Sequence, residues 1–243
     1  SYWSLMPLEP VHCVIPARMG SSRFPGKPLY KLCGREMILW TMDRAHQAGC
    51  FSKIVCATDD SRIAHVVKSA GYEAVLTGNA ATGSDRVALA SKQLGLDLVV
   101  NLQGDEPTVD LDLLRHVAMA LAKEPEYWVS AFSPLRKEDL LKNSVVKVAV
   151  SSDGFATDFR RSVPENEFGQ WAEHRGIYAY SFKSREEFFA LPQASREQAE
   201  SLEQLRILGK TPIRMVETQV PSYSVDLLSD VPAVEEQLKS LLT

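Results

Sequence analysis

The segment VHCVIPARMGSSRFPGKPL, residues 11–29, constrains the fold of this chain more than any other. Its first six residues, 11–16, are mostly apolar and predict a short buried strand. The loop that follows contains glycine and serine residues and three cations, Arg18, Arg23 and Lys27. Glycine lets a loop backbone turn its N–H groups toward a ligand, while arginine and lysine side chains bind phosphate oxygens. A strand that leads into such a loop places it at the carboxyl edge of a sheet, where open α/β folds bind ligands.

Taken alone, this loop also fits a second interpretation, a solvated basic turn. It is not a Walker A motif, because no Gly-Lys-Ser/Thr sequence follows at the required spacing. The formal net charge of the chain is −4, which excludes a general electrostatic affinity for nucleic acid or for an anionic membrane. The cations therefore indicate a local anion site in a mildly acidic protein, if the rest of the chain supports one.

Apolar segments of strand length alternate with segments of helical periodicity as far as about residue 125. The expected strands cover residues 11–16, 53–58, 73–76 and 96–102, and the expected helices cover residues 37–48, 61–70, 82–94 and 111–123. Such alternation is typical of βαβ units. It predicts an α/β fold with a mostly parallel sheet flanked by helices.

The second half of the chain has more strands in succession. Strands are expected at residues 128–135, 145–150, 155–159, 175–182 and 213–217, and helices at 185–191, 198–209 and from about 229. No linker, repeat or low-complexity segment divides the chain, so we expect residues 1–243 to form a single domain, with residues 1–10 as a disordered lead. We expect the part at about 127–182 to be an antiparallel or mixed extension, which often covers a substrate or joins two subunits.

The sequence contains no apolar run that approaches the ~20 residues of a membrane span. Its first residues lack the basic start and apolar core of a signal peptide. The four cysteines, Cys13, Cys33, Cys50 and Cys56, fall at no metal-ligand spacing. We therefore expect a cytoplasmic protein with reduced thiols and with neither membrane nor nucleic acid as a partner.

Three polar segments follow strands of the expected parallel sheet, namely residues 17–27 (ARMGSSRFPGK), 82–86 (TGSDR) and 103–107 (QGDEP). Because the carboxyl ends of parallel strands meet at one edge of a sheet, we expect these segments to line one cleft. Asp105 comes directly after a buried strand, where it could hold Mg²⁺. This ion prefers one or two carboxylates together with phosphate oxygens.

Each candidate has a simpler interpretation when it is taken singly. Asp105 could cap a turn or a helix. Arg86, in the first turn of its expected helix, could bind a phosphate or a base edge, or it could form a surface salt bridge. Asp226, between a possible strand and the last helix, could be a second metal ligand. The convergence of three segments, more than any one residue, favours a binding site.

Several motifs occur in order across most of the chain: IPARMGSSRFPGKPL, ATDD, TGSDR, NLQGDEP, HRGIYAY and ESLEQLRIL. Together they resemble the CMP-Kdo synthetases, the 3-deoxy-manno-octulosonate cytidylyltransferases of lipopolysaccharide synthesis. The first loop is also similar to that of CMP-sialic acid synthetases, but QGDEP and SLEQLR favour the Kdo branch. The resemblance implies a Rossmann-like nucleotidyltransferase fold, a homodimer, CTP as the donor, Mg²⁺ as the cofactor, and a CMP-sugar released with pyrophosphate.

The resemblance also implies roles for residues on the nucleotide side. Arg18 and Lys27 match the cations that bind the triphosphate, with Arg23 close by. Arg86 and Gln103 match residues that read the cytidine.

The implied metal ligands are two aspartates. Asp105 matches one Mg²⁺-binding aspartate and Asp226 aligns with the other. Asp105, Lys27 and Arg18 are the implied catalytic residues. The segment around Asp226 reads Ser-Val-Asp-Leu-Leu at 224–228, whereas the family usually has a Gly-Val-Asp-Thr-Pro-type segment, so the turn chemistry differs.

On the sugar side the implied residues are Arg161, His174, Tyr178, Glu203 and Gln204. A histidine such as His174 is more often structural when it is taken alone, and only its place in HRGIYAY favours a binding role.

Near these positions the chain departs from the family, and the departures leave the identity of the acceptor open. Arg175 stands where an apolar residue is usual, and the segment at 162–173 is short. An 8-amino-3,8-dideoxy analogue of Kdo is therefore an alternative acceptor to Kdo itself. The chain could also be a sialic-acid-type synthetase that acts on another ulosonic acid, or a nucleotide-binding protein without turnover. The presence of Asp105 and the loop cations argues against a protein without turnover.

Overall fold

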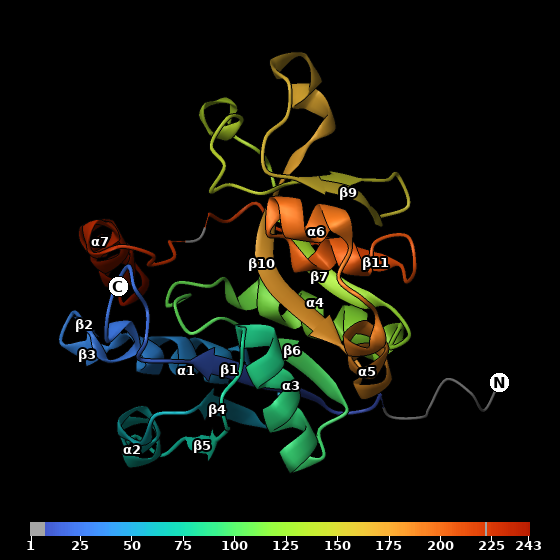
Figure 1. Ribbon diagram of the computed structural model, residues 1–243. Helices are drawn as coiled ribbons and strands as arrows, with labels where there is room; N and C mark the ends of the chain where they lie inside the picture. Colours follow the sequence, from blue (N-terminus) through green and yellow to red (C-terminus); the bar gives the residue numbers. More distant parts are fainter. Residues whose placement is uncertain (1–7, 222) are drawn as a thin grey trace.

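Nearly all the strands of the described residues belong to one large sheet (Figure 1). The structure is a computed structural model and describes residues 8–221 and 223–243. Residues 1–7 of the expected lead lie outside the described residues, and residues 8–10 have no helix or strand. The division of the chain into domains stays a prediction.

Seven strands follow one another across the sheet in the order β11-β7-β10-β6-β1-β4-β5, and β8 and β9 extend it from β10. In chain order these strands are β1 (Val11–Ala17), β4 (Ile54–Thr58), β5 (Glu73–Leu76), β6 (Leu98–Asn101), β7 (Trp128–Ser133), β8 (Lys147–Val150), β9 (Ala156–Arg160), β10 (Ala172–Tyr180) and β11 (Ile213–Glu217). A separate hairpin consists of β2 (Lys31–Leu32) and β3 (Arg35–Glu36). The α-helices are α1 (Met37–Ala48), α2 (Ser61–Ser69), α3 (Gly83–Leu94), α4 (Leu111–Lys123), α5 (Phe182–Ala190), α6 (Ser195–Glu200) and α7 (Val231–Leu241).

The strand directions confirm the expected fold class. Strands β6, β1, β4 and β5 are parallel to one another, and β11 is parallel to β7. Strand β10 lies between these two groups and runs antiparallel to both β6 and β7. The hairpin of β8 and β9 joins the same strand, so the antiparallel part of the sheet comes from the second half of the chain, as expected.

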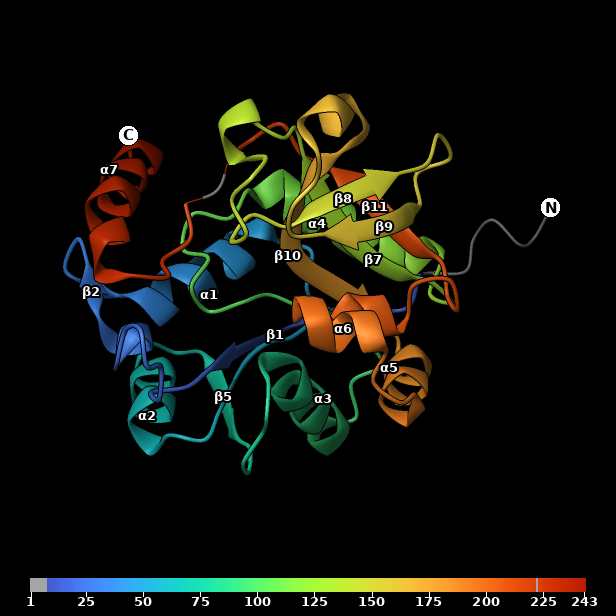
Figure 2. The ribbon, with the colours of Figure 1, turned by 45° about the horizontal axis from the view of Figure 1, so that its top comes forward.

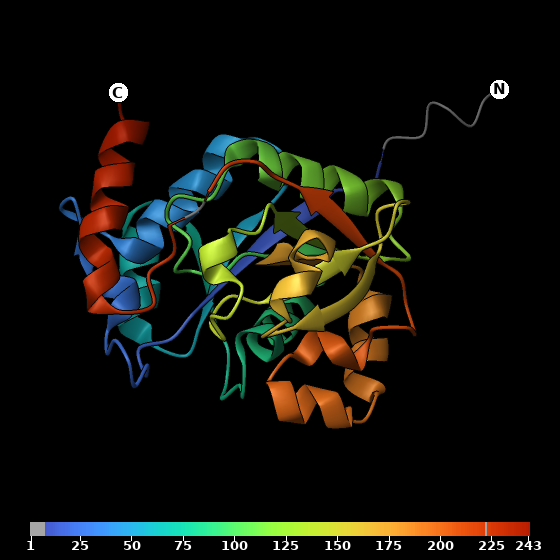
Figure 3. The ribbon, with the colours of Figure 1, turned by 90° about the horizontal axis from the view of Figure 1, so that it is seen from above.

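Helices cover both faces of the sheet, and each face has its own core. Helices α1, α2 and α4 pack on one face, where Met42, Ile63 and Val117 are fully buried. Helices α3 and α5 pack on the other face, with Val87 and Phe188 in the core. Figure 3 shows α1 and α4 on one side of β1, and α3, α5 and α6 on the other. Strand β6 is buried along its whole length because both of its faces are covered, which explains its run of Leu98, Val99 and Val100.

Local sequence signals set the ends of several helices. Helix α1 ends at Gly49, whose φ of 67° is the left-handed conformation that glycine adopts without strain. The side chain of Asp60 accepts a hydrogen bond from the backbone N–H of Arg62 and so caps α2. Helix α3 begins with a capping box between Thr82 and Asp85.

The expected helix at 198–209 is wrong. Helix α6 ends at Ser201, which has a left-handed φ of 53°, and a 3₁₀ helix (Glu203–Arg206) follows. The backbone N–H of Leu202 turns back to the carbonyl of Glu197, so the chain cannot continue as one α-helix. The apolar residues Leu202, Leu205 and Ile207 of this segment are buried, but their spacing did not reveal the break.

A third, smaller core joins the first loop to the last helix. Helix α7 packs beside the β2–β3 hairpin, as Figure 2 shows. Three residues are buried together there: Phe24 of the first loop, Val225 of the segment before α7, and Val234 of α7 itself. The carboxylate of Glu235 accepts from the backbone N–H of Cys33 at 2.7 Å. Residues on both sides of Asp226 are thus held against the first loop.

The described helices are all too short or too polar to cross a membrane. All four cysteines are free, and Cys13 and Cys56 are buried.

Candidate active site

The three strand-end segments expected to converge do meet at one cavity of about 500 Å³. Residues 16–18, 82–83 and 103–105 line it, together with further residues of the first loop and Asp226 from near the end of the chain. The predicted residues that contribute to its wall are Arg18, Arg23, Lys27, Arg86, Gln103, Asp105 and Asp226. The cavity therefore gathers every residue that the sequence assigned to the nucleotide and the metal. Their individual roles stay predictions.

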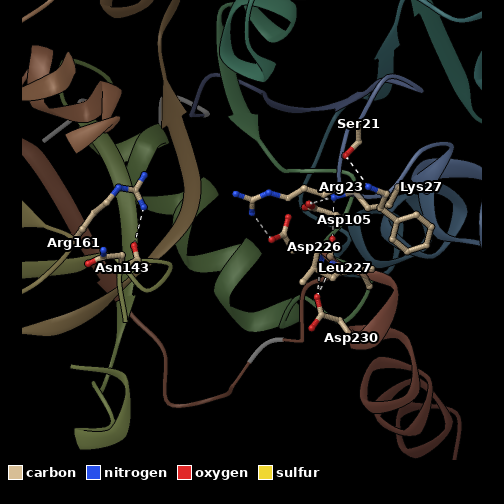
Figure 4. A network of polar contacts seen from close by, with 11 residues as sticks. Ser21, Arg23, Lys27, Asp105, Asn143, Arg161, Asp226, Leu227 and Asp230 are labelled. Atoms are coloured by element: carbon tan, nitrogen blue, oxygen red, sulfur yellow. Dashed lines mark hydrogen bonds and ion pairs between the residues drawn. The ribbon is translucent and has the colours of Figure 1, made fainter. Parts of the chain in front are cut away.

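Lys27 lies on this wall beside Asp105, as Figure 4 shows. Its Nζ donates to Oδ2 of Asp105 at 2.8 Å and to the backbone carbonyl of Val225 at 2.9 Å. The backbone N–H of Val225 also donates to the carbonyl of Asp105 at 3.1 Å. Lys27 thus connects the first loop, the end of β6 and the segment before α7.

Asp226 is held in a more exposed arrangement. Its Oδ2 lies 2.8 Å from Nη1 of Arg23, and the two side chains are 58% and 68% exposed, so this pair adds little stability. The carboxylate of Asp230 accepts from the backbone N–H groups of Asp226 and Leu227, at 3.0 and 2.8 Å. Asp230 therefore stabilises the turn in the segment that departs from the family sequence.

The residues on this wall fit a divalent cation that binds together with a phosphate ligand. Among the described residues, no group of three or more His, Cys, Asp or Glu side chains is placed to hold a metal ion. Two carboxylates, Asp105 and Asp226, do line the cavity. Mg²⁺ is commonly held by one or two carboxylates, with substrate phosphates completing its shell.

Arg86 forms an ion pair, as the second interpretation expected, but the arginine is buried, with 3% of its surface exposed, so it is not a surface residue. It belongs to the first turns of α3, and its Nη1 donates to Oγ1 of Thr77 at 2.6 Å. Its Nη2 lies 3.3 Å from Oδ2 of Asp59. The guanidinium is therefore held in one position at the cavity wall.

The side chain of Gln103 is oriented by a short chain of hydrogen bonds. Its Nε2 donates to Oδ1 of Asn101 at 3.2 Å, and Nδ2 of Asn101 donates to the hydroxyl of Tyr180 at 3.2 Å. The carbonyl Oε1 of Gln103 remains beside Gly83, where an added Cβ would lie 3.3 Å from it. The wall thus presents an acceptor at this point, and a side chain at position 83 would crowd it.

The predicted sugar residues lie outside the cavity wall, but two of them are close to it. Glu203 accepts a short hydrogen bond from the hydroxyl of Ser84, the residue after Gly83. Tyr178 pairs with Asn101 across β10 and β6, and its pKa is raised by burial and by the charge of Glu203.

Arg161 and Gln204 are arranged differently. The guanidinium of Arg161 donates to the backbone carbonyls of Glu200 (2.5 Å), Asn143 (3.0 Å) and Ser201 (3.0 Å). In Figure 4 it lies with Asn143 apart from the cluster of Lys27 and Asp105. Gln204 is buried, with 4% of its surface exposed. These hydrogen bonds use three of the five N–H donors of the guanidinium, and the sugar-binding role of Arg161 stays a prediction.

His174 packs within the interior of the second half. Its Nε2 lies 2.8 Å from the hydroxyl of Ser130, and its ring stacks edge-on against Phe159. Burial lowers the pKa of His174 to about 3, and the cation of Arg175 acts in the same direction. The imidazole is therefore neutral near pH 7 and can offer a hydrogen bond but no positive charge.

Arg175 points to the other face of the sheet. It lines a small recess with Leu102, Val109 and Leu113, and its Nη1 lies 3.3 Å from the carbonyl of Val220. All three of these neighbours belong to the core on the α4 side of the sheet, whereas Tyr178 packs with the core on the α3 side. The side chain of Arg175 thus lies on the opposite face of the sheet from Tyr178, although its charge still acts on the neighbouring His174.

Sequence reasoning missed residues whose side chains hold the backbone. Lys147 is fully buried, and its Nζ donates to the carbonyls of Lys142 (2.8 Å) and Arg161 (2.6 Å). Lys147 alternates with Val146, Val148 and Val150, so the sequence pattern indicated an exposed side chain and gave no signal of its burial. Ser84 and Asp230 gave none, since their partners are set by tertiary structure.

Comparisons with known proteins agree with this geometry. A family model described as Cytidylyltransferase matches residues 12–213. A 3-deoxy-manno-octulosonate cytidylyltransferase of Anaeromyxobacter sp. (strain Fw109-5) is 41% identical over 229 residues, covering 91% of this chain and 93% of that protein. Another, of Desulfosudis oleivorans, is 37% identical over 244 residues, covering 95% and 98%. A solved structure of CMP:2-keto-3-deoxy-manno-octonic acid synthetase complexed with CTP has a TM-score of 0.90 at 32% identity, covering 96% of this chain and 100% of that one.

The environment of His174 predicts a specific pH dependence of stability. Its pKa is lower in the folded protein, about 3, than the ordinary 6.5 expected after unfolding. Stability is therefore complete above about pH 6.5 and falls as the pH drops toward 3, because only the unfolded chain takes up the proton. Lowering the pH from 7 to 4.5 should reduce the free energy of unfolding of the wild type, measured by urea denaturation. We expect this reduction to be about 1–2 kcal/mol smaller in His174→Gln, which lacks the imidazole. The exposed His65, replaced as His65→Gln, is the control; equal losses in all three proteins would contradict the burial of His174.

Proposed function

This chain belongs to the cytidylyltransferase family, and from that premise we propose that it transfers the cytidylyl group of CTP to 3-deoxy-manno-octulosonate (Kdo). The products are CMP-Kdo and pyrophosphate, and the CMP-sugar serves lipopolysaccharide synthesis. One observation carries the proposal, namely the meeting of all seven predicted nucleotide and metal residues at one cavity.

The proposed reaction needs positioning and charge neutralisation more than covalent catalysis. A hydroxyl of the sugar acid attacks the α-phosphorus of CTP in line with the departing pyrophosphate. Arg18 and Lys27 line the cavity and can neutralise the charge that accumulates on the leaving group. Because Lys27 already binds the anionic Asp105, it can exchange this partner for a phosphate oxygen when the triphosphate enters. No protein nucleophile is required.

The family generally uses a divalent metal, and we propose Mg²⁺ here, held by Asp105 and Asp226. When bound, the cation polarises phosphate oxygens and neutralises their charge. Of the two carboxylates, Asp105 is the better anchored, because it lies between the Lys27 ammonium and the backbone of Val225.

The orientation of Gln103 supports a preference for cytosine. Cytosine presents an amino group at the position where uracil presents a carbonyl oxygen. Because Nε2 of Gln103 donates to Asn101, its Oε1 is the atom that can bind the base. This oxygen can accept a hydrogen bond from the amino group of cytosine. Opposite uracil, two acceptor oxygens would face each other. Arg86 is the second candidate for reading the base.

On the acceptor side we propose that Glu203 and Tyr178 lie nearest the sugar, with His174, Gln204 and Arg161 completing the pocket. We also propose a cytoplasmic homodimer, and that the extension at about 127–182 contributes either to the sugar pocket or to the contact between subunits. The position of Arg175 on the α4 face removes one reason for an 8-amino acceptor and favours Kdo. A nine-carbon ulosonic acid of the sialic type remains the alternative substrate.

The experiment that tests the proposal is a substrate panel. Kdo, its 8-amino-3,8-dideoxy analogue and sialic acid are each incubated with the protein, CTP and Mg²⁺ while pyrophosphate release is followed. We expect kcat/KM to be highest for Kdo. A clear preference for sialic acid would refute the Kdo assignment, and binding of CTP without pyrophosphate from any acceptor would favour a non-catalytic nucleotide-binding protein.

Replacement of Asp105 tests the metal site. We expect Asp105→Ala to lower kcat by at least ~10²-fold, the effect of removing a group that stabilises charge in the transition state. The fold should persist, because the side chain is 32% exposed and makes no core contact of its own. Asp112→Ala is the matched control, since this aspartate is 72% exposed on α4. Near-normal turnover in a folded Asp105→Ala protein would contradict the assignment.

Replacement of Gln103 tests the reading of the base. We expect Gln103→Leu to reduce the preference for CTP over UTP, measured as the ratio of kcat/KM values, by about tenfold, since a lost polar contact costs ~1–3 kcal/mol. Gln47→Leu changes an exposed glutamine of α1 and should leave the ratio unchanged. If the ratio of the Gln103→Leu variant equals that of the wild type, Gln103 does not discriminate the base.

A further inference from the structure

One hydrogen bond connects the nucleotide wall of the cavity with the segment that carries the predicted sugar residues. The hydroxyl of Ser84, in the first turn of α3, donates to Oε1 of Glu203, which begins the 3₁₀ helix after α6. The two residues are 119 positions apart in the chain. The neighbouring Gly83 lines the cavity, so this contact lies directly behind its wall.

Glu203 is a carboxylate in an unfavourable environment. The nearby cation of Arg206 is already paired with Glu197, at 3.0 Å from Nε and 2.6 Å from Nη2. Burial raises the pKa of Glu203, and the charges of Asp85 and Glu197 act in the same direction. The hydrogen bond from Ser84 and the charge of Arg206 act against them.

The remaining groups around Glu203 are neutral. Burial raises the pKa of Tyr178 and of Tyr180 on β10, and the negative charge of Glu203 raises both further. Both side chains are therefore uncharged near pH 7. A neutral hydroxyl from α3 is therefore the donor that fixes one oxygen of Glu203. With Oε1 taken up by Ser84, Oε2 is the oxygen that can accept from a substrate hydroxyl.

We infer that Ser84 is a positioning residue, whose hydroxyl holds the Glu203 carboxylate in place to bind the sugar acid. This inference rests on the proposed function, because it assigns Glu203 to the acceptor. Ser84 itself need not touch either substrate. Ser84 orients Glu203, and Glu203 binds the acceptor. Gly83 and Arg86 of the same helix line the nucleotide cavity, so the N-terminal end of α3 helps to position both reactants.

The first test compares variants of Ser84 in steady-state assays with CTP, Mg²⁺ and Kdo. We expect Ser84→Ala to raise the KM for Kdo by about tenfold, the scale of a lost hydrogen bond to a charged group, with the KM for CTP changed less than twofold. Ser84→Thr keeps a hydroxyl and should restore the KM for Kdo. If Ser84→Ala folds poorly, Ser84→Cys, which is similar in size but a weak donor, should reproduce its effect.

The matched control is Ser91→Ala on the same helix. Ser91 is fully buried, and its hydroxyl donates to the carbonyl of Val87 at 2.6 Å, within α3. Its replacement removes a hydroxyl from α3 without reaching Glu203, and it should leave both KM values unchanged.

The second test asks whether Ser84 acts through Glu203. On a Glu203→Gln background, Ser84→Ala should change the KM for Kdo by less than twofold, because residues that act as one unit are not additive. The pH profile gives an independent measure. Without the Ser84 hydrogen bond the pKa of Glu203 should rise further, so the acid limb of kcat/KM for Kdo should move to higher pH in Ser84→Ala.

The outcomes separate this inference from the proposed function. A wild-type protein that forms no CMP-Kdo would overturn both. An active wild type whose KM for Kdo does not change in Ser84→Ala, or whose KM for CTP rises equally, would overturn the inference alone. Full additivity of the Ser84 and Glu203 variants would do the same.

Discussion

The ammonium group of Lys27 is the contact on which the cavity depends. It lies between the carboxylate of Asp105 and the carbonyl of Val225, so it joins the first loop, the end of the central strand β6 and the segment before α7. Both charged side chains are only partly accessible, at 16% and 32% exposure. Removal of one charge from such a pair leaves the other without compensation, which is more costly than the pair itself is favourable. The first loop, the loop after β6 and the segment before α7 therefore depend on one another for their positions around the cavity.

The sequence predicted that the loops of the nucleotide cavity meet, for a topological reason, while the roles of their residues stay predictions. Parallel strands must end at one edge of their sheet, so the loops after β1 and β6 and the start of α3 could meet only there. The caps of the helices were also readable, since Gly49 and Asp60 act on their own neighbours in the chain.

The positions of the predicted sugar residues depend on contacts between segments that are distant in the chain. Local sequence patterns do not predict such contacts. The hydrogen bond from Ser84 to Glu203 is one example. The three carbonyls bound by Arg161 are another, because a motif match cannot tell a guanidinium that holds the backbone from one that is available to a ligand. The break at Ser201 was missed because apolar spacing reports which positions are buried, not whether the backbone stays helical.

The contact of Lys27 with Val225 also sets when the site can exist during synthesis. Strand β1 and the first loop are synthesised before the other strands of the sheet, whereas Val225 and helix α7 follow its last strand, β11. A nascent chain that already contains the parallel strands still lacks one of the two partners of Lys27. The nucleotide cavity can therefore be complete only after Val225 has been synthesised, which is later than every strand of the sheet.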